Sequence, residues 1–552
     1  MRRLVILSLL IAAGCPSGAG PQQVGSQPSW RGSGATAGPS IAPVTFAPTA
    51  EPAQRYNEPL QSAPRTPLGD AVTAAVKDAA QRAGTNVPVA DARLFRTCAE
   101  LAEVVPEEGV IGYSLVEFAL HRNGIIEPSP HLLVVWGDID SPQLIVEQLQ
   151  PRLAEILAYG ATARLGIGSA KRLPDGTGAV VFALQASGVS TSPIPRALPA
   201  GGGFQLDAVV DARFKEPEVF ITYDIGSTER LELKSGHAGG FTSKVSCGSH
   251  TGRQQVEITA SDVNGSTVLG NFPVWCGGEP PVSMTLDPST DDAPVTTTVD
   301  AEQRLLALVN RDRQTAGLPP LTWDDKVAAV ARRHSEEMRR TKNVAHISPT
   351  TGSAADRVRA ASIRTAVVLE NVARAYGVGE AHQGLMNSPG HRANITSRAA
   401  THLGIGVVFG DDVSGRREIF ITQVFTRVPP KIDPGSALVR VQQRLVQAAA
   451  PRQIGTSVRL SAIAQQLSDA LAAGKTRDQA YPLVKKQVDS LGAIYARVGS
   501  VITAAADLDT LDGKSLIGDS VVDDIGIGIA QGPHPEIGEG AMWVVILMAQ
   551  KR

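Results

Sequence analysis

The sequence has few aromatic residues, few cysteines and no excess of charge of one sign. Phe, Trp and Tyr make up 4% of the 552 residues, so smaller aliphatic side chains must fill any core. The formal net charge is −2 and no basic block stands out, which argues against a nucleic-acid partner. The chain is too long for one core, so several domains are expected.

Only four cysteines are present, and none has the spacing of a cysteine-based metal site. Cys247 and Cys276 lie in one segment of predicted strands. In an exported chain, that placement favours a disulfide between them. Cys98 lies on the apolar face of a predicted helix, and we expect it to be a buried free thiol.

Residues 1–15 have the composition of an export signal. Arg2 and Arg3 precede an apolar run over residues 4–13, which is too short to cross a bilayer and suits a signal peptide. The run leads into Gly14-Cys15, which resembles a bacterial lipobox with Cys15 as the lipidated mature N-terminus. Ala12 stands where Leu is more usual, so secretion without an anchor is the alternative. We expect an exported protein tied to the membrane of the bacterial envelope by lipid on Cys15.

Residues 16–66 are rich in Pro, Gly, Ser and Ala and poor in core-forming residues. Such a composition favours a disordered tether between the anchor and the folded body.

Three parts of the chain repeat one pattern. Each has a paired-glycine motif, followed at the same distance by an apolar strand. The motifs are Leu165-Gly166-Ile167-Gly168, Leu403-Gly404-Ile405-Gly406 and Ile525-Gly526-Ile527-Gly528. Upstream of each, apolar residues at offsets of 4, 7 and 11 from Leu94, Val327 and Leu460 predict one helix face. We infer three related α/β domains at about 67–190, 300–428 and 434–552.

Residues 198–282 have a different character. Short, partly alternating apolar runs are separated by glycines and by Asn264-Gly265, a strong hairpin signal. These runs predict an immunoglobulin-like β-sandwich that Cys247 and Cys276 would bridge. The expected strands are 204–210, 219–223, 231–233, 256–260 and 268–276. Residues 283–299 are predicted to be a linker.

The middle domain concentrates polar residues in three short motifs. They are Ala345-His346-Ile347-Ser348-Pro349, Leu369-Glu370-Asn371-Val372-Ala373 and Ser388-Pro389-Gly390-His391-Arg392. Two imidazoles and a carboxylate, in segments that are each bounded by Pro, Gly or Asn, are typical of a small polar site. Such a site either binds a metal ion or acts as an acid–base pair.

Together with Asn310-Arg311, Asp356-Arg357 and Thr422-Gln423, these motifs make residues 300–428 resemble a bacterial CAP domain. That superfamily comprises cysteine-rich secretory proteins, antigen 5 and pathogenesis-related proteins. The resemblance implies an α-β-α sandwich whose cleft often holds two His and two Glu. His346, Glu370 and His391 match three of these positions. The second acid is absent, because Ser388 stands in its place and Leu385 replaces the usual Trp; Glu380 is a weak substitute.

The outer repeats provide an internal comparison. Leu153 and Gly513 fall at the position of His391, and neither can bind a metal ion. The outer domains are therefore expected to be degenerate CAP-like copies, which leaves the site in residues 300–428. The position of His334 is Leu101 and Leu467 in the other copies, so His334 is expected to be a packed helix residue.

Altogether, the sequence predicts a multi-domain α+β envelope protein. The resemblance implies binding of a lipid, glycan, peptide or protein in the cleft, because CAP proteins are mostly secreted and mostly lack an assigned reaction. One alternative is a hydrolase with Zn²⁺ on His346 and His391 and with Glu370 as a ligand or general base. The other is a structural or adhesion protein with a relic site.

Overall fold

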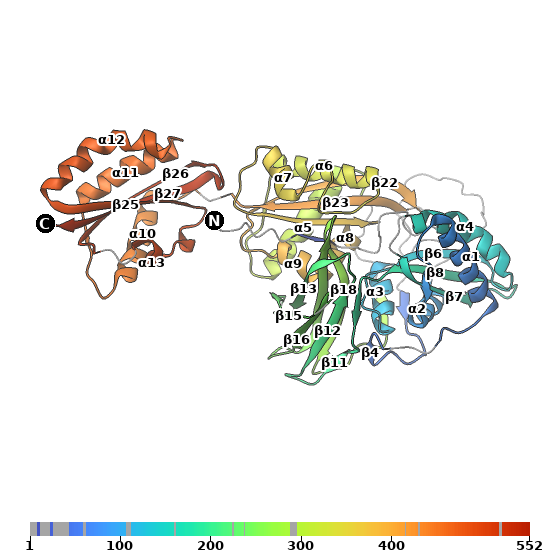
Figure 1. Cartoon of the computed structure of the whole chain (residues 1–552). Coiled ribbons are helices and arrows are strands. Elements are labelled where there is room, and N and C mark those ends of the chain that lie inside the picture. The colour runs from blue at the N-terminus through green and yellow to red at the C-terminus, as the bar shows by residue number, and fades with distance from the viewer. Residues whose placement is uncertain are drawn as a thin grey trace.

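The computed structural model describes residues 8–10, 23–25, 44–58, 62–105, 112–158, 162–223, 226–236, 238–286, 295–413, 416–428, 431–517 and 521–552. Within them the chain forms three α/β units and a body of two packed sheets. Figure 1 shows the two-sheet body beside the middle unit, with the first unit and the C-terminal unit at opposite ends.

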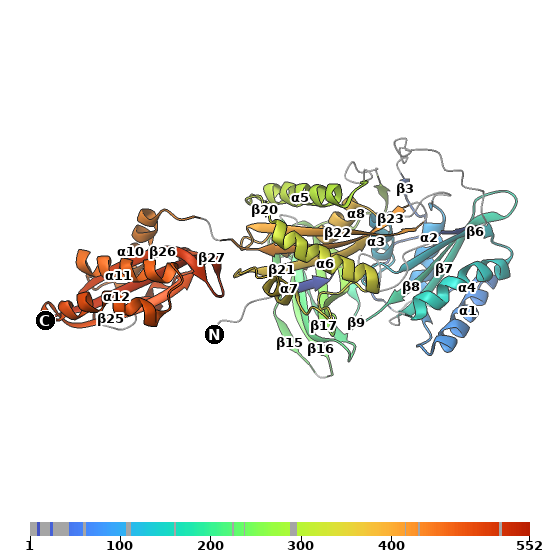
Figure 2. The ribbon, with the colours of Figure 1, turned by 90° about the horizontal axis from the view of Figure 1, so that it is seen from above.

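The middle unit is a sheet covered by helices on both faces. The strand order is β1 (Ser8–Leu10), β21 (Val368–Ala375), β23 (Arg416–Thr426), β22 (His402–Val413) and β20 (Thr322–Trp323). The helices are α5 (Thr298–Thr315), α6 (Asp325–Thr341), α7 (Ala354–Ala360), α8 (Val378–Asn387) and α9 (Pro389–Ile395). Helices α5 and α6 lie on opposite faces (Figure 2), and each face has its own apolar core.

The first unit has the same kind of sheet, in the order β2 (Gln23–Gly25), β6 (His131–Asp138), β8 (Thr177–Ala186), β7 (Thr162–Lys171) and β5 (Val89–Ala90). Its helices are α1 (Pro67–Ala83), α2 (Ala92–Ala102), α3 (Tyr113–Arg122) and α4 (Pro142–Ala158).

The C-terminal unit has four strands, in the order β24 (Gly455–Thr456), β26 (Asp524–His534), β27 (Gly538–Lys551) and β25 (Tyr495–Ala505). Its α-helices are α10 (Pro434–Ala449), α11 (Val458–Ala472), α12 (Arg477–Ser490) and α13 (Gly513–Ile517).

The three units share one strand arrangement. In each, a two-residue strand pairs in parallel with the paired-glycine strand, which then pairs antiparallel with a long central strand. Each paired-glycine strand packs against the helix that follows the two-residue strand. A Cβ added at Gly166, Gly404 or Gly526 would lie 2.6, 2.2 and 2.2 Å from backbone atoms of α2, α6 and α11. The glycines therefore allow a helix–sheet approach that any side chain would block.

The two-sheet body lies between the first and middle units in sequence. One sheet has the order β11 (Ala197–Leu198), β18 (Gly265–Cys276), β17 (Gly252–Asp262), β13 (Lys215–Thr222) and β14 (Thr228–Arg230). The other has the order β15 (Leu233–Ser235), β16 (Gly240–Ser246), β12 (Gly203–Val210) and β9 (Val189–Thr191). Both enclose one apolar core, and a disulfide joins Cys247 to Cys276 with Cα atoms 5.8 Å apart. The strand expected at 231–233 is wrong, since this segment joins two short strands in different sheets.

The expectation of a disordered tether is wrong for residues 44–58. Phe46 in β3 (Val44–Phe46) is fully buried, and β3 pairs with β19 (Met284–Leu286) from the predicted linker. Tyr56 in β4 (Arg55–Tyr56) is also fully buried; β4 pairs with β10 (Ile194–Pro195), and the Tyr56 hydroxyl donates to Pro273 O at 2.7 Å. Each aromatic ring fills part of a core, and that burial orders a segment whose average composition is that of a tether. Cys15 lies outside the described residues.

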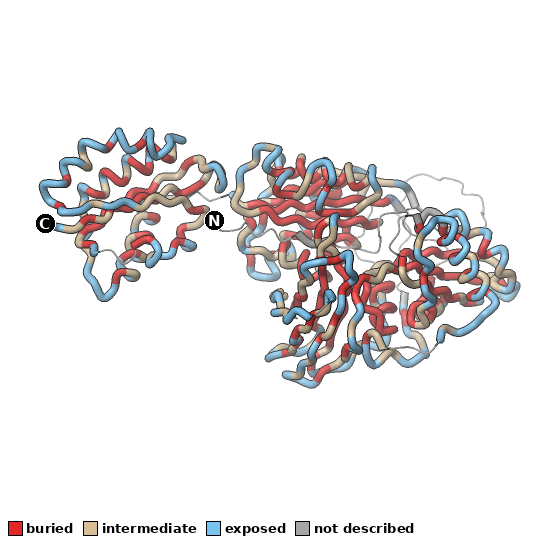
Figure 3. The backbone as a smooth tube through the Cα atoms, in the orientation of Figure 1, coloured by how far each residue is buried: buried red, intermediate tan, exposed pale blue. Residues whose placement is uncertain are grey.

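Burial follows these layers. Figure 3 shows the buried residues along the strands and the inner faces of the helices of every unit. Cys98 is buried and unbonded on α2, inside the first unit. Within the described residues, no helix combines the length and apolar character needed to cross a membrane.

Candidate functional site

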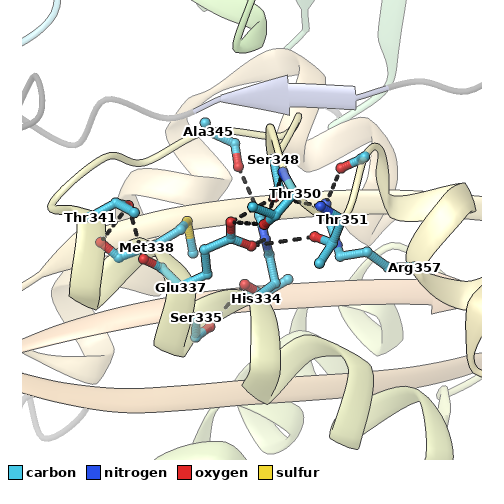
Figure 4. A network of polar contacts seen from close by, with 12 residues as sticks. His334, Ser335, Glu337, Met338, Thr341, Ala345, Ser348, Thr350, Thr351 and Arg357 are labelled. Atoms are coloured by element: carbon cyan, nitrogen blue, oxygen red, sulfur yellow. Dashed lines mark hydrogen bonds and ion pairs between the residues drawn. The ribbon is translucent and has the colours of Figure 1, made fainter.

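The loop that carries His346 is fixed by helix α6. The Glu337 carboxylate accepts hydrogen bonds from the hydroxyls of Ser348 and Thr350 at 2.6 and 2.7 Å (Figure 4). On the same helix, His334 Nε2 lies 2.8 Å from the carbonyl oxygen of Ala345. His334 is 2% exposed, so it is a packed helix residue that supports the loop.

Glu370 holds His346 inside the protein. The Glu370 side chain, from β21, is fully buried, and its Oε2 lies 2.8 Å from His346 Nδ1. Arg357, from α7, donates from Nη2 to Glu370 Oε1 and from Nη1 to His346 O at 3.1 Å. Burial alone raises the pKa of Glu370, but the Arg357 charge and the neighbouring imidazoles outweigh it and lower that pKa to about 2. Glu370 is therefore an anchor that is ionised at neutral pH.

His391 lies beside His346. It is buried on α9, and the two imidazole centroids are 6.5 Å apart with their planes inclined by 23°. His391 Nδ1 is 2.7 Å from Ser388 Oγ. The structure thus brings together the three predicted site residues, and it places Ser388 in contact with one of them.

A carboxylate from the two-sheet body reaches the same cluster. Glu257, on β17, accepts hydrogen bonds from Ser388 Oγ and, at 3.0 Å, from Gly390 N. Glu257 is fully buried, and burial raises its pKa to about 7 against the opposing effect of these two donors. By contrast, Glu380 lies in the first turn of α8. Its carboxylate accepts a hydrogen bond from Tyr376 N at 3.2 Å, just before the helix begins.

Neither the presence of Glu257 in the site nor the role of Arg357 is evident from the sequence. Glu257 lies between Val256 and Ile258, whose side chains enter the sandwich core. Alternation along the strand turns Glu257 to the outer face, where an acidic residue normally meets water. Only the packing of a second domain on that face makes it a buried residue.

The β17–β18 hairpin also touches the His346 loop. Asn264 O accepts from His346 N at 3.1 Å and from Ile347 N at 3.0 Å. Gly265 adopts φ +103°, and a Cβ there would lie 3.0 Å from His346 Cβ. The hairpin therefore packs directly on the loop that carries the first imidazole.

The donor set does not suit a resident zinc ion. Catalytic zinc usually keeps three protein ligands, and the third here would be Glu370, whose two oxygens already bind Arg357 and His346. The Arg357 guanidinium would also repel a cation. Over the part of the chain that the structure describes, no three His, Cys, Asp or Glu side chains form a metal-binding group.

The outer units have no counterpart of His391 at the aligned positions. Leu153 is fully buried in the core of the first unit. Gly513 begins α13, where an added Cβ would lie 2.6 Å from Arg444 O. One position is filled by an apolar side chain and the other has no room for one.

A family model described as the cysteine-rich secretory protein family, abbreviated CAP, matches residues 306–425. The middle unit is a CAP domain. Two curated proteins of Bacillus subtilis (strain 168) match 108 residues: the uncharacterized membrane protein YlbC at 38% identity and the uncharacterized protein YkwD at 36%. Each match covers 19% of this chain, and 31% and 42% of the two relatives.

Two solved structures are also similar to this chain. One is an extracellular protein containing an SCP domain from Bacillus anthracis, at 21% identity, covering 41% of this chain and 78% of that one, with a TM-score of 0.22. The other is a cysteine-rich secretory protein from Staphylococcus aureus, at 14% identity, covering 44% and 83%, with a TM-score of 0.20. Scores at this level do not extend the identification beyond the CAP domain.

Proposed function

We propose that this chain is an exported bacterial envelope protein, anchored by lipid on Cys15, whose CAP domain binds an envelope component without hydrolysing it. The outer α/β units would be degenerate CAP-like copies and the two-sheet body an immunoglobulin-like module. The shared strand order and the repeated glycine packing support the first relation, and the disulfide between the ends of the two sheets supports the second.

The state of Glu370 carries this proposal. An efficient general base has a pKa near the working pH, whereas Arg357 and the imidazoles hold the pKa of Glu370 at about 2. Its two oxygens are also occupied by those neighbours. A carboxylate in this state orients His346 and is poorly suited to activate water.

The same contact suggests the ligand chemistry. An ionised carboxylate only accepts hydrogen bonds, so a neutral His346 imidazole has its hydrogen on Nδ1 and its lone pair on Nε2. His346 Nε2 is buried and has no hydrogen-bond partner among the described residues. A ligand that reaches this nitrogen must donate a hydrogen bond, as the hydroxyl groups of glycans and lipid headgroups do.

A structural role is the second candidate, and the β17–β18 hairpin favours it. The hairpin accepts hydrogen bonds from His346 N and Ile347 N, and both imidazoles are buried. In this case the buried cluster joins two domains and binds nothing.

The binding proposal predicts that a small molecule copurifies with the chain. The protein is isolated from its native envelope, and its organic extract and metal content are measured by mass spectrometry. We expect a glycan or lipid to be retained by the natural chain, lost from the His346→Ala/His391→Ala variant, and retained by His382→Ala. His382 is a matched control, because it is a buried histidine of the same domain whose Nε2 contacts Asp312 at 2.7 Å, outside the cluster.

Other outcomes would contradict the proposal. Stoichiometric zinc that is lost only from the double variant would favour the hydrolase. Absence of any ligand, together with an unchanged envelope phenotype in the double variant, would favour the structural role.

The proposed lipid anchor on Cys15 can be tested separately. Cys15→Ser should release the chain from the membrane fraction into the soluble exported fraction, because the cysteine thiol is the site of lipidation. Cell fractionation followed by immunoblotting measures this, and membrane retention of Cys15→Ser at the natural level would refute the anchor.

A further inference from the structure

The β-sandwich inserts one carboxylate into the CAP domain at a defined place. Glu257 is fully buried, and its two side-chain oxygens face the start of α9, where they accept from Ser388 Oγ and Gly390 N. Ser388 stands where the CAP resemblance implies a second acid. The missing carboxylate is thus replaced by one that approaches through Ser388 from another domain.

The hydrogen bonds from Glu257 through Ser388 to His391 determine which ring nitrogen of His391 carries the hydrogen. An ionised Glu257 only accepts, so the single hydrogen of the Ser388 hydroxyl points to it. Ser388 Oγ then has only lone pairs left for His391 Nδ1, 2.7 Å away. The hydrogen of the neutral imidazole must therefore lie on Nδ1.

The two imidazoles are then held in the same way. His346 Nδ1 donates directly to Glu370, and His391 Nδ1 donates to Glu257 through Ser388. A carboxylate behind an imidazole fixes its tautomer and raises the basicity of the other ring nitrogen. Each imidazole is therefore oriented by a carboxylate on its Nδ1 side, although the two carboxylates come from different domains.

The surrounding interface holds Glu257 in place. The hairpin oxygen of Asn264 binds the His346 loop, and Asn271 Nδ2 donates to Asn387 O at 3.2 Å at the end of α8. Asn264 lies in the turn of the β17–β18 hairpin and Asn271 on β18, next to the strand that carries Glu257, so the docked hairpin sets the position of the carboxylate.

We propose that Glu257 is the second acid and fourth member of the CAP site, supplied across the domain interface, and that it acts as a positioning residue that fixes the Nδ1–H tautomer of His391. The site is then composite, and a CAP domain without the sandwich lacks one of its acids. This assignment does not depend on the identity of a ligand or on whether one binds.

The test is ¹⁵N NMR of the histidine-labelled full-length chain, which distinguishes Nδ1–H from Nε2–H imidazoles. Burial raises the pKa of Glu257 to about 7, so spectra are recorded well above that value, where Glu257 is ionised. His391→Gln assigns the signal. We expect the natural chain to show His391 with its hydrogen on Nδ1.

Glu257→Gln should reverse this tautomer. The glutamine oxygen keeps the hydrogen bond from Gly390 N, and its amide nitrogen then donates to Ser388 Oγ. The Ser388 hydrogen turns to His391 Nδ1, which moves the imidazole hydrogen to Nε2. Glu117→Gln is the matched control, since Glu117 is a buried carboxyl on α3 of the first unit that accepts from Asn387 Nδ2, next to Ser388 in the chain, at 3.1 Å. It should leave the His391 signal unchanged.

A second variant tests whether a carboxylate placed at position 388 can replace Glu257. Glu257→Ala/Ser388→Glu places the carboxylate on the CAP domain itself and should restore the Nδ1–H signal that Glu257→Ala alone loses. An Nε2–H imidazole in the natural chain would overturn the proposal without any variant. An unchanged His391 signal in Glu257→Gln, or an equal change in Glu117→Gln, would also overturn it.

Discussion

Replacing Arg357 with alanine is expected to destabilise the CAP domain by about 3–5 kcal/mol, the cost of leaving a buried charge without its partner. Arg357 donates to the carboxylate of Glu370 and to the carbonyl oxygens of His346 and Gly352. Glu370 and His346 lie inside the protein, so water cannot replace the guanidinium there. The loss therefore leaves the Glu370 carboxylate without its cationic partner and removes a donor from the His346 carbonyl, whereas Gly352 O keeps its hydrogen bond from Ser348 N.

The same substitution should reverse the pH dependence of stability. In the natural protein the pKa of Glu370 is depressed from 4.5 to about 2, so its contribution is complete above 4.5 and is lost as pH falls towards 2. Burial is already the largest single influence on this pKa, and without Arg357 only the imidazoles oppose it, so we expect the pKa to rise above 4.5. The variant is then penalised as pH rises above 4.5, because unfolding releases a proton from Glu370.

Hydrogen exchange of peptides from β21 measures both effects within the CAP domain, which avoids treating a multi-domain chain as one cooperative unit. Arg359→Ala is the control, because Arg359 lies on the same helix, pairs with Asp356 and is 75% exposed. It should change stability by no more than about 0.5 kcal/mol. Equal protection of β21 in Arg357→Ala and Arg359→Ala would show that Glu370 is not anchored by Arg357.

Features repeated along the chain could be predicted from the sequence. The paired glycines and the apolar helix face appear three times, and the structure packs one against the other in each unit. The CAP motifs likewise gave His346, Glu370 and His391, which the fold brings together. These features depend on local spacing, which a sequence displays directly.

Features that depend on the meeting of distant segments could not be predicted. The position of Glu257 on β17 predicts a solvent-exposed side chain, and only the docking of the CAP domain on that face buries it. Phe46 and Tyr56 are lone aromatic residues in a tether-like composition, and their burial depends on partners more than 200 residues away at Met284 and Pro273. Average composition hides such single contacts.

The paired glycines should tolerate no side chain. A Cβ at Gly406 would lie 2.1 Å from the backbone nitrogen of Arg332, so Gly406→Ala forces α6 away from β22. Overpacking of this kind costs about 3 kcal/mol or more when the obstacle is backbone that cannot rotate aside. We expect Gly406→Ala to lose most CAP-domain protection in hydrogen exchange or to fail to accumulate.

The displacement of α6 should also reach the site. Helix α6 carries His334, which contacts Ala345 before His346, and Glu337, which binds Ser348 after it. Any Gly406→Ala protein that folds should therefore show an altered His346 signal. Gly499→Ala on β25 is the control, because an added Cβ there meets no atom within 4 Å.

Gly168→Ala and Gly528→Ala should damage their own units as Gly406→Ala damages the CAP domain, since their added Cβ atoms would lie 2.0 and 2.2 Å from helix backbone. A stable Gly406→Ala chain with an unchanged His346 signal would mean that the close approach of helix and strand is not required in the CAP domain.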